Sequence, residues 1–301
     1  MSKEICIFFK KEIIKDQIKK LLFRNISNGP NTLIENTLAG LKKNNLNYKL
    51  NPKNIEKDQI CWVINDKKKL ENLLSLKDKI KFKLIVGPNI SILPSDYKHL
   101  LCSENIENII VPSPWVKDLW LEISSFDIKK KIIIWPVGID EKYWCPQKKI
   151  RKKYDFLIYI KNYFQNNIIE NCIQYMKKKK INFKIIKYGQ YKKKDYLKYL
   201  RESKVNIFFS KSESQSISQF ESWSTNVPVI IYEPKKRFMK QYKTVAKSGP
   251  YSNKHNGYQF NNISEFIDLI NKLDILKKNP RNWILNNHTT KNSILSLLKK
   301  I

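Results

Sequence analysis

The feature that most constrains the fold is an alternation of short, continuously apolar segments with segments of amphipathic helical period. The apolar segments predict strands at residues 4–9, 59–64, 82–86, 108–112, 131–136, 155–160, 183–189, 205–210, 227–233 and 258–260. Helical periodicity lies between them, at 33–41, 113–120, 168–180, 195–203, 219–224, 264–276 and 284–300. Apolar strands that alternate with helices are typical of a parallel sheet covered on both faces. Because the pattern occurs twice, the sequence predicts an α/β protein of two doubly wound, Rossmann-like domains that face a cleft.

A lysine-rich segment without apolar periodicity, QKKIRKK at residues 147–153, separates the two copies of the pattern. We therefore place the domain boundary there, with one domain at 1–146 and the other at 147–301. The last helix of the second domain can pack back on the first. The apolar run near the N-terminus is short and interrupted by lysines, and no run of about 18 uncharged apolar residues follows. These features predict a cytoplasmic protein.

The chain has a formal net charge of +31, which raises the question of an anionic partner. Arginine, which phosphate-fork and base recognition favour, occupies only five positions, and the lysine runs are spread along the chain. This distribution favours a solvated lysine surface and makes a nucleic-acid partner the weaker alternative. Peripheral contact with an anionic membrane, or a phosphorylated substrate, also fits the charge.

The five cysteines are far apart, odd in number and without a C-x-x-C pair (Cys6, Cys61, Cys102, Cys145, Cys172). This spacing argues against a zinc site and against a disulfide framework. We expect reduced, mostly buried thiols.

Two glutamates, Glu213 and Glu221, lie in the segment SESQSISQFESWSTNVPVII, between two predicted strands. In an open parallel sheet, ligands bind beyond the carboxyl ends of the strands, and the N-terminus of a following helix suits phosphate. Both carboxylates can therefore face one cleft and accept hydrogen bonds from sugar hydroxyls. Two alternatives stay open: Ser218-x-x-Glu221 is also a capping box, and Glu213 can be an exposed loop residue.

The same segment resembles the E-x7-E segment of retaining glycosyltransferases of the GT-B fold, above all glycosyltransferase family four. Further segments are similar to that family in the same order: VPSPWVKDLW at 111–120, WPVGIDEKYWCP at 135–146 and KHNGYQF at 254–260. With weaker similarity around residues 28–31, which includes Gly29, the resemblance covers most of the chain.

The resemblance implies a nucleotide-sugar donor held mainly by the second domain and a glycan or lipid-linked acceptor on the side of the first. Glu221 would bond the donor ribose, and Glu213, the catalytic candidate, would contact the donor sugar near the reacting carbon. Backbone N–H groups of Gln215, Ser216 and Ile217 would line the diphosphate. Lys161, and secondarily Lys211, would supply positive charge. The reaction implied is sugar transfer with retention, without a cofactor or a metal.

The sequence departs from the family pattern in three ways. The loop at 215–218 lacks the usual glycine, only Lys161 of the usual basic pair is clear, and the active-site histidine has no match except His99 in a polar loop. A catalytically inactive GT-B scaffold therefore remains an alternative. Asn89, after the strand at 82–86, either binds substrate hydroxyls or belongs to a plain turn.

Overall fold

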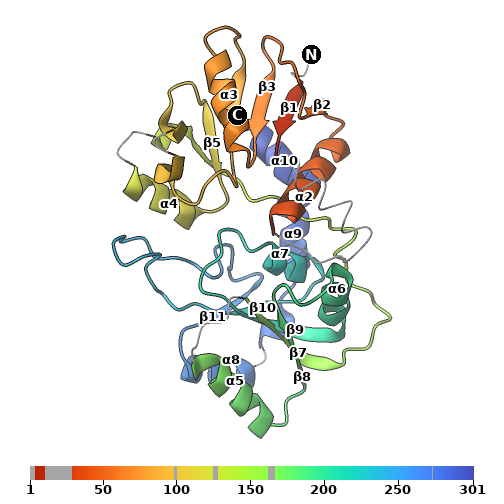
Figure 1. The fold of residues 1–301 in the computed structure, drawn as a ribbon. Helices are drawn as coiled ribbons and strands as arrows, with labels where there is room; N and C mark the ends of the chain where they lie inside the picture. The colour runs from red at the N-terminus through yellow and green to blue at the C-terminus, as the bar shows by residue number, and fades with distance from the viewer. Residues whose placement is uncertain (1–3, 11–28, 98–99, 125–127, 162–166, 273) are drawn as a thin grey trace.

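The computed structural model describes residues 4–10, 29–97, 100–124, 128–161, 167–272 and 274–301 (Figure 1). In this part of the chain, six strands pair in parallel in the order β2-β1-β3-β4-β5-β6. Their bounds are β1 Ile5–Phe8, β2 Tyr48–Leu50, β3 Ile60–Val63, β4 Lys83–Val86, β5 Asn108–Val111 and β6 Ile132–Ile134.

A second sheet of five parallel strands has the order β11-β10-β9-β7-β8. Its strands are β7 Tyr154–Ile160, β8 Phe183–Lys187, β9 Ser203–Phe209, β10 Val229–Tyr232 and β11 Gly257–Phe260. In both sheets the first strand of the sequence lies between the second and the third. The strand order therefore reverses between β1 and β3 and again between β7 and β9, and such switch points are where open α/β sheets bind ligands.

Helices cover both faces of each sheet, as the predicted doubly wound fold requires. Helices α3 (Lys67–Leu76) and α4 (Pro114–Ile123) cover one face of the first sheet, and α2 (Gly29–Lys43) and α10 (Thr290–Leu298) the other. On the second sheet, α5 (Asn167–Lys178) and α8 (Ile263–Lys272) lie opposite α6 (Lys193–Glu202), α7 (Ile217–Ser224) and α9 (Pro280–Asn287). The fold prediction is confirmed.

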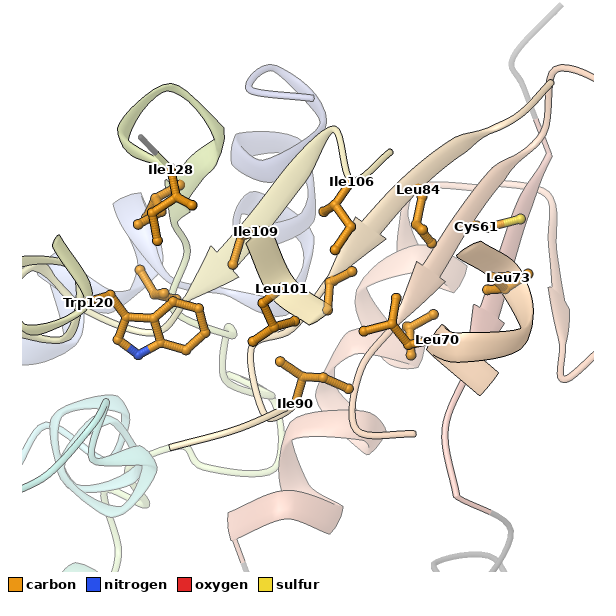
Figure 2. Close-up of a cluster of buried hydrophobic side chains, with 14 of the residues drawn as sticks. Cys61, Leu70, Leu73, Leu84, Ile90, Leu101, Ile106, Ile109, Trp120 and Ile128 are labelled. Atoms are coloured by element: carbon orange, nitrogen blue, oxygen red, sulfur yellow. The ribbon is translucent and has the colours of Figure 1, made fainter. Parts of the chain in front are cut away.

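Each core is built from strand residues that alternate between the two faces. On β1, Cys6 and Phe8 join the cluster under α3 and α4, while Ile5 and Ile7 join the cluster under α2. Figure 2 shows the first of these clusters, in which Leu70 of α3 and Trp120 of α4 meet the strand side chains. All five cysteines are free: Cys6, Cys61 and Cys172 are buried, and Cys102 and Cys145 are half-buried.

The C-terminal segment returns to the first domain, where Figure 1 shows the blue α10 beside the orange α2. The helix predicted at 284–300 is two helices, because the chain leaves helical geometry at Thr289, whose φ and ψ are −63° and 156°. There the backbone pairs with Ile139, which donates its N–H to the His288 carbonyl. A Cβ atom at Gly40 would lie 2.4 Å from the Thr290 carbonyl oxygen, so α10 packs directly on the α2 backbone. The domain boundary between residues 146 and 147 remains our proposal.

Other differences from the sequence-based expectations are local. The three-residue edge strand β2 is largely exposed, and α3 is rich in lysine, so neither gave a clear apolar signal. The helix predicted at 195–203 begins two residues earlier, so Asp195 is the third residue of α6, and its carboxylate accepts the Lys192 N–H. In the described part of the chain, no helix is long and apolar enough to cross a bilayer.

A hairpin at residues 234–247, between β10 and β11, leaves the second domain and contacts the first. Arg237 and Val245 pair as an antiparallel bridge within it. The carboxylate of Glu122, on α4, accepts hydrogen bonds from the Lys243 N–H and from the N–H and hydroxyl of Thr244. The 234–247 hairpin therefore joins the two domains at one side of the cleft.

Candidate active site

A cavity of about 610 Å³ lies between the two domains, at the carboxyl ends of both sheets. Its lining residues follow strands or begin helices in both domains. From the first domain come Gly29, Pro30, Thr32, Leu33, Asn65, Asn89, Ile90, Ser91, Ile92, Asp96 and Pro112. From the second come Tyr159, Lys161, Tyr188, Tyr191, Glu213, Ser214, Gln215, Ser216, Ile217, Ser218 and Glu221. This is the position at which a switch point predicts a ligand.

Glu213 follows β9 and is buried, with 4% of its surface exposed. Its Oε2 lies 2.8 Å from the Lys161 ammonium, and its Oε1 accepts the Ser210 hydroxyl at 2.8 Å. Its backbone N–H donates to the Lys247 carbonyl of the 234–247 hairpin, and its carbonyl accepts the indole N–H of Trp115 on α4. The interpretation of Glu213 as an ordinary exposed loop residue is therefore wrong.

Lys161 follows β7, the neighbour of β9, so the two charged side chains meet across the switch point. Its ammonium is also 5.1 Å from the centre of the Tyr188 ring. An ammonium has three N–H donors, and the pair with Glu213 uses one. With 25% of its side chain exposed, Lys161 can donate to an anion in the cavity as well.

The loop at 214–216 is fixed by Gln215. Its side-chain amide donates to the Val137 carbonyl at 2.7 Å and accepts the Val137 N–H at 3.0 Å. These two buried bonds tie the loop to the segment that follows the first sheet. Because these bonds occupy the Gln215 side chain, only the backbone N–H of this residue is left for the predicted contact with a diphosphate.

Ser216 is the N-cap of α7 and takes a left-handed backbone conformation, with φ 67° and ψ 68°. This conformation favours glycine, the residue that the resemblance leads one to expect in this loop. The chain thus makes a glycine-type turn with serine. The buried Ser216 hydroxyl has no hydrogen-bond partner in the described part of the chain.

Glu221 lies in α7, with 4% of its surface exposed. The capping-box alternative is wrong, because α7 begins at Ile217 and its N-cap is Ser216. Among the described residues, none forms a hydrogen bond or ion pair with the Glu221 carboxylate. Burial raises the pKa of this carboxyl to about 8; the Lys193 ammonium opposes that shift and Glu35 adds to it. The carboxyl therefore lies at the cavity, and no residue of the described chain bonds it.

The structure brings together most of the residues singled out in the sequence. Glu213, Glu221, Lys161, Gln215, Ser216, Ile217, Asn89 and Gly29 all line the cavity. Lys211 does not: it is exposed and is not among the lining residues. His99 lies outside the described residues.

Sequence reasoning missed three tyrosines of the cavity. Tyr159 lies at the end of β7, and Tyr188 and Tyr191 follow β8, the strand beside it. The hydroxyls of Tyr159 and Tyr191 are 2.8 Å apart. The position of Tyr188 and Tyr191 beyond the carboxyl end of β8, next to the switch point, was a usable signal. Five tryptophans, in contrast, are buried: Trp115, Trp120, Trp135, Trp144 and Trp223.

The arrangement offers hydrogen-bond acceptors, one ammonium, a helix N-terminus and aromatic rings, which together suit a polar, anionic ligand with hydroxyl groups. Among the described residues, no three His, Cys, Asp or Glu side chains are placed to hold a metal ion. His288 lies outside the cavity lining, against the rings of Phe220 and Trp283, and burial lowers its pKa to about 4.

No family model and no curated protein matches the sequence. The fold, however, is similar to solved structures. Sucrose-phosphate synthase from Thermosynechococcus elongatus aligns over 99% of this chain and 98% of its own, with 11% identity and a TM-score of 0.63. HepE of Anabaena, solved in complex with UDP and glucose, aligns over 99% of both chains, with 10% identity and a TM-score of 0.57. TarM aligns over 81% of this chain and 55% of its own, with 16% identity and a TM-score of 0.55. At these identities the similarity establishes the two-domain GT-B fold.

The raised pKa of Glu221 predicts a pH-dependent stability. The ordinary pKa of this carboxyl is 4.5 and its pKa in the folded protein is about 8. Between these two pH values the folded protein therefore binds more protons than the unfolded chain does. The contribution of Glu221 to the free energy of unfolding therefore falls as pH rises through this window, by at most about 1.4 kcal/mol per pH unit. Glu221→Gln, which is neutral throughout, should become progressively more stable relative to the parent protein. Urea denaturation across the window measures this; a constant difference would contradict a protonated Glu221.

The left-handed conformation of Ser216 predicts an order of stability. A left-handed backbone costs a non-glycine residue about 1–2 kcal/mol, and glycine's extra freedom in the unfolded chain costs about 0.5–1 kcal/mol. Ser216→Gly should therefore unfold within about 1 kcal/mol of the parent, while the β-branched Ser216→Val loses stability. Ser216→Ala is the control for the hydroxyl. Thermal unfolding of the three variants tests this; a valine variant as stable as the glycine variant would contradict the assigned conformation.

Proposed function

We propose that this protein is a glycosyltransferase that moves a sugar from a nucleoside-diphosphate sugar to a glycan or lipid-linked acceptor, with retention at the anomeric carbon. The observation that supports this proposal best is that one cavity at a switch point is lined by Lys161, Glu213, Glu221 and the start of α7. The GT-B fold and the resemblance to glycosyltransferase family four through the E-x7-E segment support it. HepE, which shares the fold, was solved with UDP and glucose.

The diphosphate of the donor fits the start of α7. The first backbone N–H groups of a helix have no partner within the helix and carry the positive end of its dipole. The Ser216 hydroxyl, without a partner among the described residues, adds a donor there. Lys161 would neutralise charge that develops on the leaving nucleoside diphosphate as the bond to the sugar breaks.

The two glutamates would hold different parts of the donor. The Glu221 carboxyl, buried and without a bonding partner in the described chain, would bond the ribose hydroxyls, which supply the donors it lacks. Glu213, held by Lys161 and Ser210, would bond the hydroxyls of the sugar beside the reacting carbon. Tyr188 and Tyr191 offer ring faces to the base.

The acceptor would approach from the first domain. Asn89, Asn65 and Asp96 line that side of the cavity and can bond an acceptor hydroxyl. We propose that no metal or other cofactor takes part, since Lys161 and α7 supply the positive charge. The positive surface would keep the enzyme near an anionic membrane on the cytoplasmic side.

A panel of nucleoside diphosphates and their sugars tests the proposal by thermal unfolding. A ligand at 100 times its dissociation constant adds about 2.7 kcal/mol of stability, and we expect this for one nucleotide family. Glu221→Gln should weaken the stabilisation, while Glu213→Gln should reduce turnover of the donor more than binding.

Glu71→Gln is the matched control, because Glu71 is exposed on α3 and is not among the residues that line the cavity. It should behave as the parent protein does. Stabilisation that survives Glu221→Ala unchanged would contradict the role of Glu221, and a panel without effect would contradict the proposed function.

A further inference from the structure

A side chamber of about 200 Å³ adjoins the main cavity at its first-domain end. The two spaces share Asn89, Ser91, Ile92, Pro112 and Ser214 as lining residues. The chamber continues from there under α4, so a molecule in the main cavity can extend into it.

The walls of the side chamber are mainly apolar. They include Val111, Trp115, Val116, Leu119, Trp120 and Phe238. The two indole N–H groups face other partners: Trp115 donates to the Glu213 carbonyl and Trp120 to the Ile92 carbonyl. The two indole rings therefore line the chamber with carbon atoms. An apolar space of this kind excludes water and favours an apolar occupant.

The side chamber lies beside the candidate catalytic group. Ser212 and Ser214, the neighbours of Glu213 in the chain, both line it. The indole of Trp115, another lining residue, is bonded to the Glu213 backbone. An apolar group in the chamber is therefore next to the place where acceptor and donor would react.

The hairpin that contributes Phe238 to the side chamber is strongly positive. Phe238 lines the chamber from the 234–247 hairpin, and this hairpin contains no acidic residue. Its exposed cations are Lys235, Lys236, Arg237, Lys240 and Lys243, and Met239 is exposed among them. Charge complementarity selects an occupant that carries anionic groups close to its apolar part.

We propose that the side chamber holds the apolar chain of a lipid-linked acceptor, joined to the acceptor's polar end by a phosphate that the 234–247 hairpin binds. This inference rests on the proposed function and names its acceptor class. A polar glycan acceptor would leave the apolar walls unused. A neutral alkyl acceptor would leave the cations of the hairpin unused.

Calorimetric binding of n-alkyl phosphates with two, four, six and eight carbons, each below its critical micelle concentration, tests the proposal. Each methylene that enters the chamber should tighten binding about fourfold, until the chamber is full. Octyl phosphate should also bind more tightly than octyl glucoside, and less tightly as salt rises. Equal affinity along the series would overturn the assignment of the chamber. Equal affinity for the phosphate and the glucoside would overturn the anionic acceptor.

Ser212→Phe is the decisive variant, because Ser212 lines the side chamber but not the main cavity. The phenyl ring should fill the chamber and abolish the dependence on chain length. Ser75→Phe, at an exposed position on α3, should leave that dependence intact. A chain-length dependence that persists in Ser212→Phe would overturn the proposal.

Thermal stabilisation by nucleoside diphosphates separates this inference from the proposed function. It should persist in Ser212→Phe, which also shows that the variant is folded. If nucleotides fail to stabilise the parent protein, the proposed function fails. If they succeed while alkyl phosphates show no chain-length dependence, only the acceptor class fails.

Discussion

The ion pair between Lys161 and Glu213 is the interaction on which the geometry of the cavity depends. The two residues follow adjacent parallel strands, β7 and β9, so the crossover topology places both at one edge of the sheet. A carboxylate as buried as Glu213 is costly unless it is paired and hydrogen-bonded, and Lys161 and Ser210 meet that need. The backbone of the same residue bonds Trp115 of the first domain and Lys247 of the 234–247 hairpin. One residue thus connects the sheet, the hairpin and the opposite domain.

The carboxyl of Glu221 differs from that of Glu213 in its bonding. Its carboxyl is as buried as that of Glu213 but has no bonding partner among the described residues, and its pKa is raised. Natural proteins bury such a group at a cost, which a ligand with hydroxyl donors would offset. The Glu213 side chain is therefore held by the protein itself, whereas we propose that a ligand supplies the hydrogen-bond donors for Glu221. Gln215 holds the loop between them through its two bonds to Val137.

The fold and several residues that line the cavity followed from the sequence for identifiable reasons. Buried parallel strands such as β7 and β9 are continuously apolar, and the residues just beyond them lie at the ligand-binding edge, which located Lys161 and Glu213. The exposed strand β2 lacked that signal. The break at Thr289 depends on pairing with Ile139, about half the chain away, which no local pattern reveals. The left-handed backbone conformation of Ser216 and the absence of Lys211 from the cavity lining depend on backbone geometry that residue types do not specify.

The central claim is that a sugar nucleotide lies at the switch point between β7 and β9. A crystal structure of the protein with the nucleoside diphosphate that stabilises it most tests this directly. We predict diphosphate oxygens at the first N–H groups of α7 and at the Lys161 ammonium, with a ribose hydroxyl bonded to the Glu221 carboxyl. A nucleotide bound elsewhere, or bound here with Glu221 making no contact to it, would contradict the account.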